Sequence, residues 1–329
     1  MSKMTLGLVG ATGCIGKEIV DLLEPDERVD TLVPIASKGT KEPQISFRSQ
    51  SVSLRELESS ALSSVDAVIA AGPASIGKDG LQFIVDEGIP LIDLSGVWGS
   101  SVPVMAAGFE ADQGNRLREA GVVSAARPES LILARILRCV QEVSPVLRVG
   151  GTMMMPAAVA GRDGVEELSR QVVSMFNSQE PPRNLFPRGL AFDVLPSWGG
   201  IGESGWAGYE LLCALQTGLL TRMNPQLIGV DVAVLPLFGG MAAALRFDFG
   251  PGWEIDAIRA AVKDSEDLEW TPPEKLMPRR FIGSSSLAVG RLRSDLSQTS
   301  LHLWVCCDPQ RLAAENAVGL MEQLLWSEA

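Results

Sequence analysis

Residues 5–23 read TLGLVGATGCIGKEIVDLL, and the inference of a fold begins with them. The apolar run Thr5–Val9 predicts a buried strand, and Lys17–Leu23 has its apolar residues at helical spacing before Pro25. Between them lie the three glycines of the segment Gly10–Gly16. A glycine triple that follows a strand and opens a helix is typical of a dinucleotide-binding turn, in which the helix N-terminus favours a pyrophosphate. A degenerate turn that no longer holds a nucleotide is the alternative.

The pattern of strand followed by helix continues along the first third of the chain. Short apolar runs at Thr31–Ala36, Asp66–Gly72 (ending in a glycine turn) and Ile89–Leu94 alternate with helical spacing around Leu81–Asp86. Residues 49–65 carry little pattern. Such alternation predicts an α/β domain with a Rossmann-type, doubly wound parallel sheet.

After about residue 127 the pattern changes. Amphipathic helices are predicted at 130–142, 164–175, 210–219 and 309–326, and strands at 149–155, 230–237, 242–249, 285–292 and 300–305. Residues 178–205 are rich in Pro and Gly and predict a long ordered excursion. The second part of the chain is therefore expected to be α+β, with a mixed or antiparallel sheet.

Composition narrows the possible functions. The 329 residues carry a net charge of −12, which argues against a nucleic-acid partner or an anionic membrane surface. The longest apolar run, 232–245, contains Pro236 and is shorter than the about 20 residues of a membrane-spanning helix. Five cysteines without a CxxC pair favour a reducing cytoplasm over a disulfide framework. The single histidine, His302, excludes a metal site built from several histidines.

The end of the second predicted strand bears on the choice of cofactor. An NAD-selective enzyme usually has an acid there to bond the ribose 2′-hydroxyl, but this chain has Ala36-Ser37-Lys38-Gly39-Thr40-Lys41. A hydroxyl and two ammonium groups favour a 2′-phosphate, and hence NADP. A solvated basic loop is the alternative interpretation.

Several collinear segments together resemble the aspartate-semialdehyde dehydrogenase family, and especially a divergent paralogous branch of it. They are residues 8–16, 36–37, 71–72, 91–96, 161–168, 191–196, 303–305 and 314–318. Carried over residue by residue, the resemblance implies cofactor contacts at Gly10, Thr12, Gly13, Cys14, Ile15, Ser37, Lys38, Ala71 and Gly72.

The resemblance also implies an architecture and a reaction. A Rossmann domain would comprise residues 1–127 and be completed by the C-terminal helix, 309–329. An α+β substrate and dimerisation domain, 128–308, would lie between them and form a homodimer. The family's reaction is the NADP-dependent reductive dephosphorylation of an acyl phosphate, or its reverse. A Cys thiolate forms a thioester, a His acts as acid and base, and Arg side chains hold the substrate's anionic groups.

This chain departs from the family where the chemistry should be. Glu129 falls at the position of the nucleophilic Cys, and Met241 falls at that of the His. Anion-binding Arg positions hold Gly39, Gly99 and Val234, a Gln position holds Met155, and Glu210 is loosely aligned with an acidic substrate contact. Pro128 and Glu129 also make an ordinary helix start. We therefore predict no catalytic residue in these positions and no metal.

Two substitute groups were weighed for the missing chemistry. Cys139 lies ten residues beyond Glu129, about 15 Å along a helix, and so cannot take over directly. His302 lies in a predicted strand beside Trp304, where a structural role is favoured.

Three functions remain open at this point. The first is a binding or regulatory protein that has lost the parent activity and keeps a nucleotide pocket. The second is an active NADP-linked oxidoreductase for an aldehyde or acyl substrate, formally an aspartate-semialdehyde dehydrogenase in amino-acid biosynthesis. The third is a structural partner of another protein.

Overall fold

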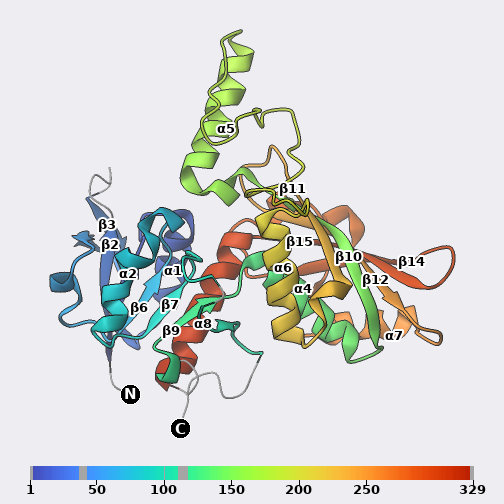
Figure 1. Cartoon of the computed structure of the whole chain (residues 1–329), viewed down its shortest axis with the longest axis horizontal. Helices are drawn as coiled ribbons and strands as arrows, with labels where there is room; N and C mark the ends of the chain where they lie inside the picture. Colours follow the sequence, from blue (N-terminus) through green and yellow to red (C-terminus); the bar gives the residue numbers. More distant parts are fainter. Residues whose placement is uncertain (1–2, 37–42, 100, 110–117, 327–329) are drawn as a thin grey trace. The chain divides into compact units, whose positions relative to one another are not determined.

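The first of two units is built on a seven-stranded parallel sheet (Figure 1). It comprises residues 1–127 and 310–329, the second unit comprises residues 128–309, and the computed structural model describes residues 3–36, 43–99, 101–109 and 118–326. The strands are β1 (Met4–Val9), β2 (Val29–Ala36), β5 (Arg55–Glu56), β6 (Ala67–Ala70), β7 (Leu91–Asp93), β8 (Val104–Met105) and β9 (Val122–Ala125). Their order is β5-β2-β1-β6-β7-β9-β8, and every pairing is parallel. The predicted Rossmann-type sheet is confirmed.

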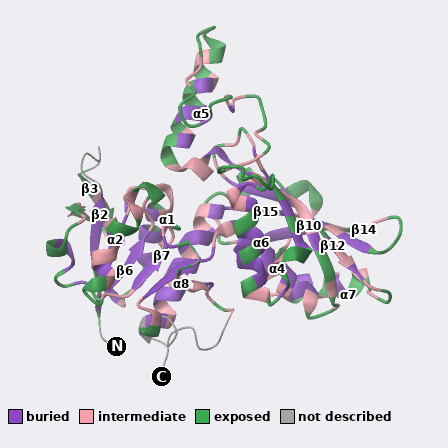
Figure 2. Cartoon of the chain, viewed as in Figure 1, coloured by how far each residue is buried: buried purple, intermediate pink, exposed green. Residues whose placement is uncertain are grey.

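Both faces of this sheet are covered, which is why its strands are short continuous apolar runs. On β6, Ala67 and Ile69 belong to one buried cluster, and Val68 and Ala70 belong to another. The first cluster includes residues of α1 (Cys14–Leu23), and the second includes residues of α2 (Gly77–Asp86). Figure 2 shows these strands coloured as buried.

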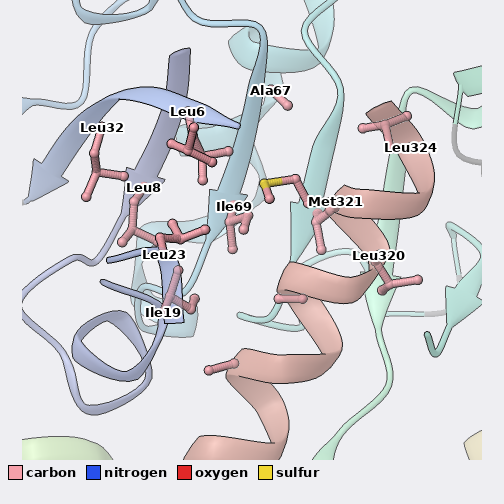
Figure 3. Close-up of a cluster of buried hydrophobic side chains, with 14 of the residues drawn as sticks. Leu6, Leu8, Ile19, Leu23, Leu32, Ala67, Ile69, Leu320, Met321 and Leu324 are labelled. Carbon is pink, nitrogen blue, oxygen red and sulfur yellow. The ribbon is translucent and has the colours of Figure 1, made fainter. Parts of the chain in front are cut away.

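The C-terminal helix α8 (Pro309–Trp326) completes the first unit. Ala317, Leu320, Met321 and Leu324 recur at helical spacing and pack in the same cluster as β1 and α1 (Figure 3). Residues from the two ends of the chain therefore form one core.

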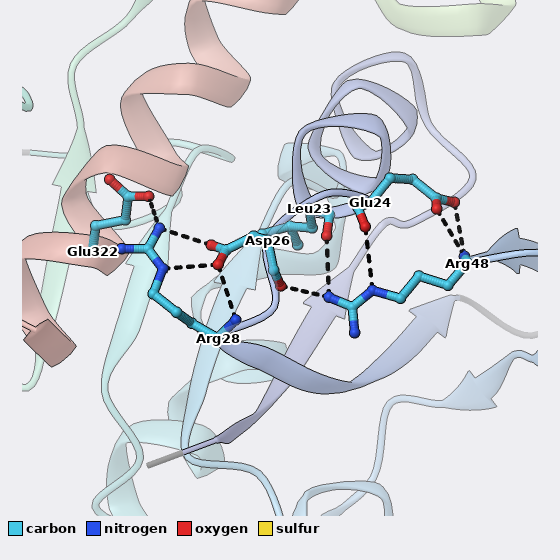
Figure 4. A network of polar contacts seen from close by, with 6 residues as sticks. All are labelled: Leu23, Glu24, Asp26, Arg28, Arg48 and Glu322. Carbon is cyan, nitrogen blue, oxygen red and sulfur yellow. Dashed lines mark hydrogen bonds and ion pairs between the residues drawn. The ribbon is translucent and has the colours of Figure 1, made fainter. Parts of the chain in front are cut away.

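A network of charges joins the end of α1 to α8 (Figure 4). The Arg28 guanidinium donates to both carboxylate oxygens of Asp26 at 2.8 and 2.9 Å, and also to Glu322 on α8. The backbone N–H of Arg48 donates to both carboxylate oxygens of Glu24, each at 2.9 Å. The hydrogen bond from Arg28 lowers the pKa of Asp26 below its usual 3.8. The stabilisation from the Asp26–Arg28 pair is therefore present above about pH 3.8, and it is lost as the pH falls through the lowered pKa of Asp26.

The second unit holds a six-stranded mixed sheet. Its strands are β10 (Val146–Met155), β11 (Ile228–Val234), β12 (Met241–Phe249), β13 (Glu269–Trp270), β14 (Ala288–Ser294) and β15 (Ser300–Cys307), in the order β11-β10-β12-β15-β14-β13. The pairs β10–β11 and β13–β14 are parallel, and the others are antiparallel. The helices are α4 (Pro128–Gln141), α5 (Gly161–Phe176), α6 (Gly208–Thr221) and α7 (Ile255–Asp264). The predicted α+β unit is confirmed.

Some elements were not predicted because their sequences lack a strong period. The hairpin of β3 (Gln44–Phe47) and β4 (Gln50–Ser53) turns at Arg48 and Ser49, which have φ of 50° and 60°. Asn-Gly pairs usually occupy turns with such positive φ angles. Because Arg and Ser occupy them here, the sequence shows no recognisable turn pattern. Among the described residues, no helix has both the length and the apolar character needed to cross a membrane.

The shared core predicts that α8 contributes strongly to the stability of the first unit. Leu320 is fully buried, so Leu320→Ala should lower the free energy of unfolding by about 2–5 kcal/mol. Leu296→Ala, at a fully exposed leucine, is the matched control and should leave it within about 0.5 kcal/mol. Thermal unfolding followed by circular dichroism measures both, and equal stability of the two variants would contradict the packing.

Candidate functional site

The glycine turn of the first unit lies at the carboxyl end of β1. Its neighbour is the segment Ala71–Gly72, which follows β6, and the Ala71 N–H donates to the Val9 carbonyl at 2.9 Å. The chain passes from β1 to β2 on one side of β1 and later crosses to β6 on its other side. The order in which strands are added to the sheet therefore reverses between β1 and β6. Ligands of doubly wound sheets bind at such a switch point. The structure thus brings Gly10–Ile15 together with Ala71 and Gly72.

Two of the three glycines are required by packing. Gly10 has φ of +81°, and a Cβ there would lie 2.7 Å from Gly72 backbone atoms. A Cβ on Gly16 would lie 2.1 Å from the Gly10 carbonyl oxygen. Neither position accepts a larger residue, whether or not a ligand binds.

Gly13 is less strictly required by packing than Gly10 and Gly16. It is the N-cap of α1 with extended backbone, and a Cβ there would approach only the Gly10 carbonyl oxygen, at 3.2 Å. Neither a side-chain cap nor an acid in the first turn occupies this helix N-terminus. A bare backbone at Gly13 fits a group that must approach the amides of the first turn closely, as a pyrophosphate does.

The predicted 2′-phosphate contacts cannot be located. Ser37, Lys38 and Gly39 lie outside the described residues, directly after the end of β2 at Ala36. In the segment after β7, the buried Asp93 accepts hydrogen bonds from the Ser95 N–H at 2.8 Å and the Gly96 N–H at 3.1 Å. Burial raises the pKa of Asp93 while these bonds oppose the rise. The Asp93 carboxyl therefore holds the turn at Ser95 and Gly96. Gly99, at a predicted anion-binding position of the family, lies exposed after this turn.

In the second unit, the positions of the family's catalytic residues meet at one end of the sheet. Met155 pairs with Val234, Met154 pairs with Ala242, and Met241 pairs with Cys307. Val234, Met155, Met241 and Cys307 therefore form one row across β11, β10, β12 and β15, which we call the buried row. Each of its side chains is at most 3% exposed.

Glu129 lies beside this row. It stands in the first turn of α4, is 2% exposed, and its charge acts on the Cys307 thiol. Burial is the main cause that raises the pKa of Cys307, and Asp308, Cys306 and Glu129 raise it further. Glu129 and Met241, the residues predicted at the family's Cys and His positions, thus both lie within packed core.

The single histidine cannot serve this end of the sheet. Side chains alternate along a strand, so Cys307 shares a face of β15 with Leu301, Leu303 and Val305, while His302 points to the opposite face. Its register partners are Arg246 and Arg293. Burial and these two arginines lower the pKa of His302.

The remaining cysteines offer no replacement nucleophile. Burial raises the pKa of Cys139 and of Cys306 to about 11, and Cys213 is also buried. Cys14, in the glycine turn, is half-buried. Among the residues that the structure describes, no group of three His, Cys, Asp or Glu side chains could hold a metal ion.

Glu210 serves the fold. Its two carboxylate oxygens accept the Ala207 N–H at 2.9 Å and the Val232 N–H at 3.1 Å, so it ties α6 to β11.

Two further buried side chains on α5, Glu167 and Gln171, hold the predicted excursion of residues 178–205, a role that no sequence pattern predicted. Glu167 accepts backbone N–H bonds from Asn184, Leu185 and Phe186, and Gln171 accepts them from Leu190 and Ala191.

Comparison with known families matches two sequence profiles to the chain. "Semialdehyde dehydrogenase, NAD binding domain" matches residues 5–112, and "Semialdehyde dehydrogenase, dimerisation domain" matches residues 144–310.

Full-length relatives carry two kinds of name. A USG-1 protein homolog of Azotobacter vinelandii is 28% identical, with 97% of each chain covered. An aspartate-semialdehyde dehydrogenase of Rickettsia bellii is 22% identical, with 98% of each chain covered. Among solved structures, aspartate semialdehyde dehydrogenase II of Vibrio cholerae, complexed with ASA, has a TM-score of 0.92 at 20% identity and full coverage of both chains. The fold is therefore that of these enzymes.

Cysteine reactivity tests the description of the site. At pH 8, a thiol of pKa about 11 is only about 0.1% thiolate, and burial excludes the reagent. Iodoacetamide followed by intact-mass spectrometry should therefore modify Cys14 alone in the native protein, and all five cysteines after denaturation. Rapid native modification of Cys139 or Cys307 would contradict the absence of a substitute nucleophile.

Proposed function

Because the chain belongs to the semialdehyde dehydrogenase family, we propose that it is a member that keeps a dinucleotide pocket and has lost the parent reaction. The observation that carries this proposal is the buried row: Met241, at the family's His position, is 1% exposed and pairs with Cys307, and the buried Glu129, where the family has Cys, acts on the same thiol. The chain would then act by binding, as a regulatory or partner protein.

The parent reaction requires groups that these residues cannot supply. A thiolate must add to the aldehyde carbonyl to give a thiohemiacetal. This adduct releases hydride as it becomes a thioester, and in the reverse direction the thioester accepts hydride. The Glu129 carboxylate would give an acyl anhydride, which does not support the same hydride step. The Met241 thioether carries no proton to transfer, and Val234 cannot pair with a substrate carboxylate.

We propose NADP as the cofactor of the first unit. Gly10, Thr12, Gly13, Cys14 and Ile15 would hold the pyrophosphate, with Ala71 and Gly72 across the switch point, and Ser37 and Lys38 would meet the 2′-phosphate. The open backbone at Gly13 supports this proposal, as does the NAD-binding description of the matching profile. A Candida albicans aspartate semialdehyde dehydrogenase with NADP has the same fold, with a TM-score of 0.73. When bound, NADP would supply hydride-transfer chemistry.

We also propose a homodimer in the cytoplasm, formed through the second unit. The dimerisation profile matches this unit, and α6 exposes Leu211, Leu212, Leu215 and Leu219 along one side. A contiguous apolar stripe of this kind is the sort of surface that a second copy covers.

An active oxidoreductase with a less charged substrate is the second candidate. The combination that favours it is the uncapped Gly13 backbone with the apolar side chains Met155, Val234 and Met241 at the family's Gln, Arg and His positions. Aspartate semialdehyde itself is the formal version of this alternative.

Cofactor binding can be followed at Cys14, because it lies in the turn that NADP would cover. NADP should slow the alkylation of Cys14, and calorimetry should give a matching dissociation constant. Gly13→Val should abolish both effects. Its Cβ would lie 3.2 Å from the Gly10 carbonyl oxygen, so the turn has to shift by a few tenths of an ångström, and circular dichroism checks that the variant folds. Gly229→Val is the control. Gly229 lies in the second unit, and a Cβ there would have no atom within 4 Å. Unchanged Cys14 reactivity at millimolar NADP or NAD would refute both the pocket and the second candidate.

Turnover tests the loss of chemistry separately. With aspartate semialdehyde, phosphate and NADP, the rate should be below about 10⁻⁴ of that of the Vibrio cholerae enzyme assayed in parallel, because both nucleophile and acid/base are absent. The change in absorbance of NADPH measures it. Comparable turnover would disprove the loss of activity, and turnover of only an uncharged aldehyde would establish the second candidate.

A further inference from the structure

A hollow of about 290 Å³ lies in the second unit, on the face of the sheet to which His302 points. Its lining includes Arg246 of β12, Arg291 and Arg293 of β14, and His302 and Trp304 of β15. We call it the arginine pocket. Register partners share a face of a sheet, so the pocket lies on the face opposite that of Met241 and Cys307.

An irregularity in β14 directs two arginines into this pocket. Gly290 pairs with Trp304 and Arg293 pairs with His302, so three steps along β14 match two along β15. The extra residue makes a β-bulge, and Arg291 within it has φ of 55°, a strained conformation for a residue other than glycine. In a regular strand Arg291 and Arg293 would share a face that excludes Gly290; the bulge instead places all three beside Trp304 and His302. Strain that the fold retains next to a concave surface is a reason to look for a ligand.

The charges in the pocket are only partly compensated. The Arg246 Nε donates to Asp248 at 2.7 Å, and Asp248 also accepts the Ser300 hydroxyl at 2.8 Å. Neither Arg291 nor Arg293 forms an ion pair with any residue in the described ranges. In a chain of net charge −12, this pocket concentrates positive charge against the overall balance.

The pocket also offers an aromatic surface. Trp304 is half-buried, and its neighbours across the strands are the small residues Ala244 and Gly290. Part of the Trp304 side chain packs against the buried cluster of Ala242, Leu276, Phe281, Ala288 and Cys306, and the small neighbours leave the rest of it to line the pocket. Guanidinium groups bind phosphate and carboxylate oxygens in pairs, and an indole stacks on flat rings.

We propose that the arginine pocket binds a small organic anion, with its phosphate or carboxylate held by Arg291 and Arg293 and its flat or apolar part against Trp304. The volume is near the lower end of the about 300–1,000 Å³ typical of ligand pockets, which suits a compact metabolite. This site is independent of the proposed dinucleotide pocket, so either can fail alone.

The sole histidine provides a direct probe. The imidazole C–H signals of the untagged protein come from His302 alone, so an NMR titration needs no assignment. The probes are inorganic phosphate, phenyl phosphate and benzoate, each against sodium chloride of equal ionic strength, which controls for screening. We expect saturable shifts of the His302 signals, and tighter binding of phenyl phosphate than of inorganic phosphate because of Trp304.

Bound anion should also raise the pKa of His302. In the structure this pKa is lowered by burial, Arg293 and Arg246, while Asp295 and Asp248 oppose the lowering. A negative charge beside the two arginines offsets their effect.

Matched variants identify the binding groups. Arg291→Gln with Arg293→Gln should weaken binding at least about tenfold, whereas Arg188→Gln, at an exposed arginine elsewhere in the unit, should not change it. Gly150→Val should block the pocket without removing charge, because Gly150 lines it. The fold should accept the change, because a Cβ at Gly150 meets only the Gly229 carbonyl oxygen, at 3.4 Å. Thermal unfolding confirms that each variant is folded.

Three results would overturn the proposal. The first is no anion-dependent shift of His302 up to about 20 mM ligand at matched ionic strength. The second is a shift that the double arginine variant and Gly150→Val both leave unchanged. The third is a His302 signal that depends on protein concentration and ignores added anion, which would assign this face to a contact between two copies of the chain.

Discussion

Side chains on a β-strand alternate between the two faces of its sheet, and the chemistry of the second unit depends on this constraint along β15. Cys307 lies on one face, in register with Met241 and beside Glu129. His302 lies on the other, five residues earlier, with Arg246 and Arg293. The single imidazole of the chain is therefore kept away from the buried row by the fold itself. To bring His302 to the face of Cys307, β15 would have to shift its register by one residue. That shift would turn the apolar side chains Leu301, Leu303 and Val305 out of the core.

The first unit separates the needs of packing from those of a ligand. Gly10 and Gly16 are required because a Cβ at either would overlap neighbouring backbone. Their presence follows from the fold and says little about binding. At Gly13 a Cβ would meet only one atom, the Gly10 carbonyl oxygen at 3.2 Å, which is a milder conflict than at the other two glycines, and no side chain caps the first turn of α1. The case for a dinucleotide consequently rests on Gly13, more than on the glycine triple as a whole.

The sequence predicted the two sheets because long apolar runs and helical periods mark β1, β10, β12, α4 and α8 clearly. It missed the β3–β4 hairpin, whose Arg48–Ser49 turn lacks the usual residues, and α7, which buries only Ile258 and Val262. At the candidate site, alignment with the family could place Glu129 and Met241 in their positions. It could not reveal that Cys307 pairs with Met241, or that a bulge in β14 brings Arg291 to the pocket that His302 also lines, because both depend on register between distant strands.

The central claim is that a nucleotide pocket persists in a chain whose former catalytic centre has become core. A crystal structure of the protein grown with NADP tests both halves at once. We predict a dinucleotide on the Gly10–Gly16 turn and continuous packing around Glu129 and Met241, with no opening that could admit a substrate. An empty turn, or an open cleft in which Glu129 or Met241 faces the nicotinamide, would contradict this account.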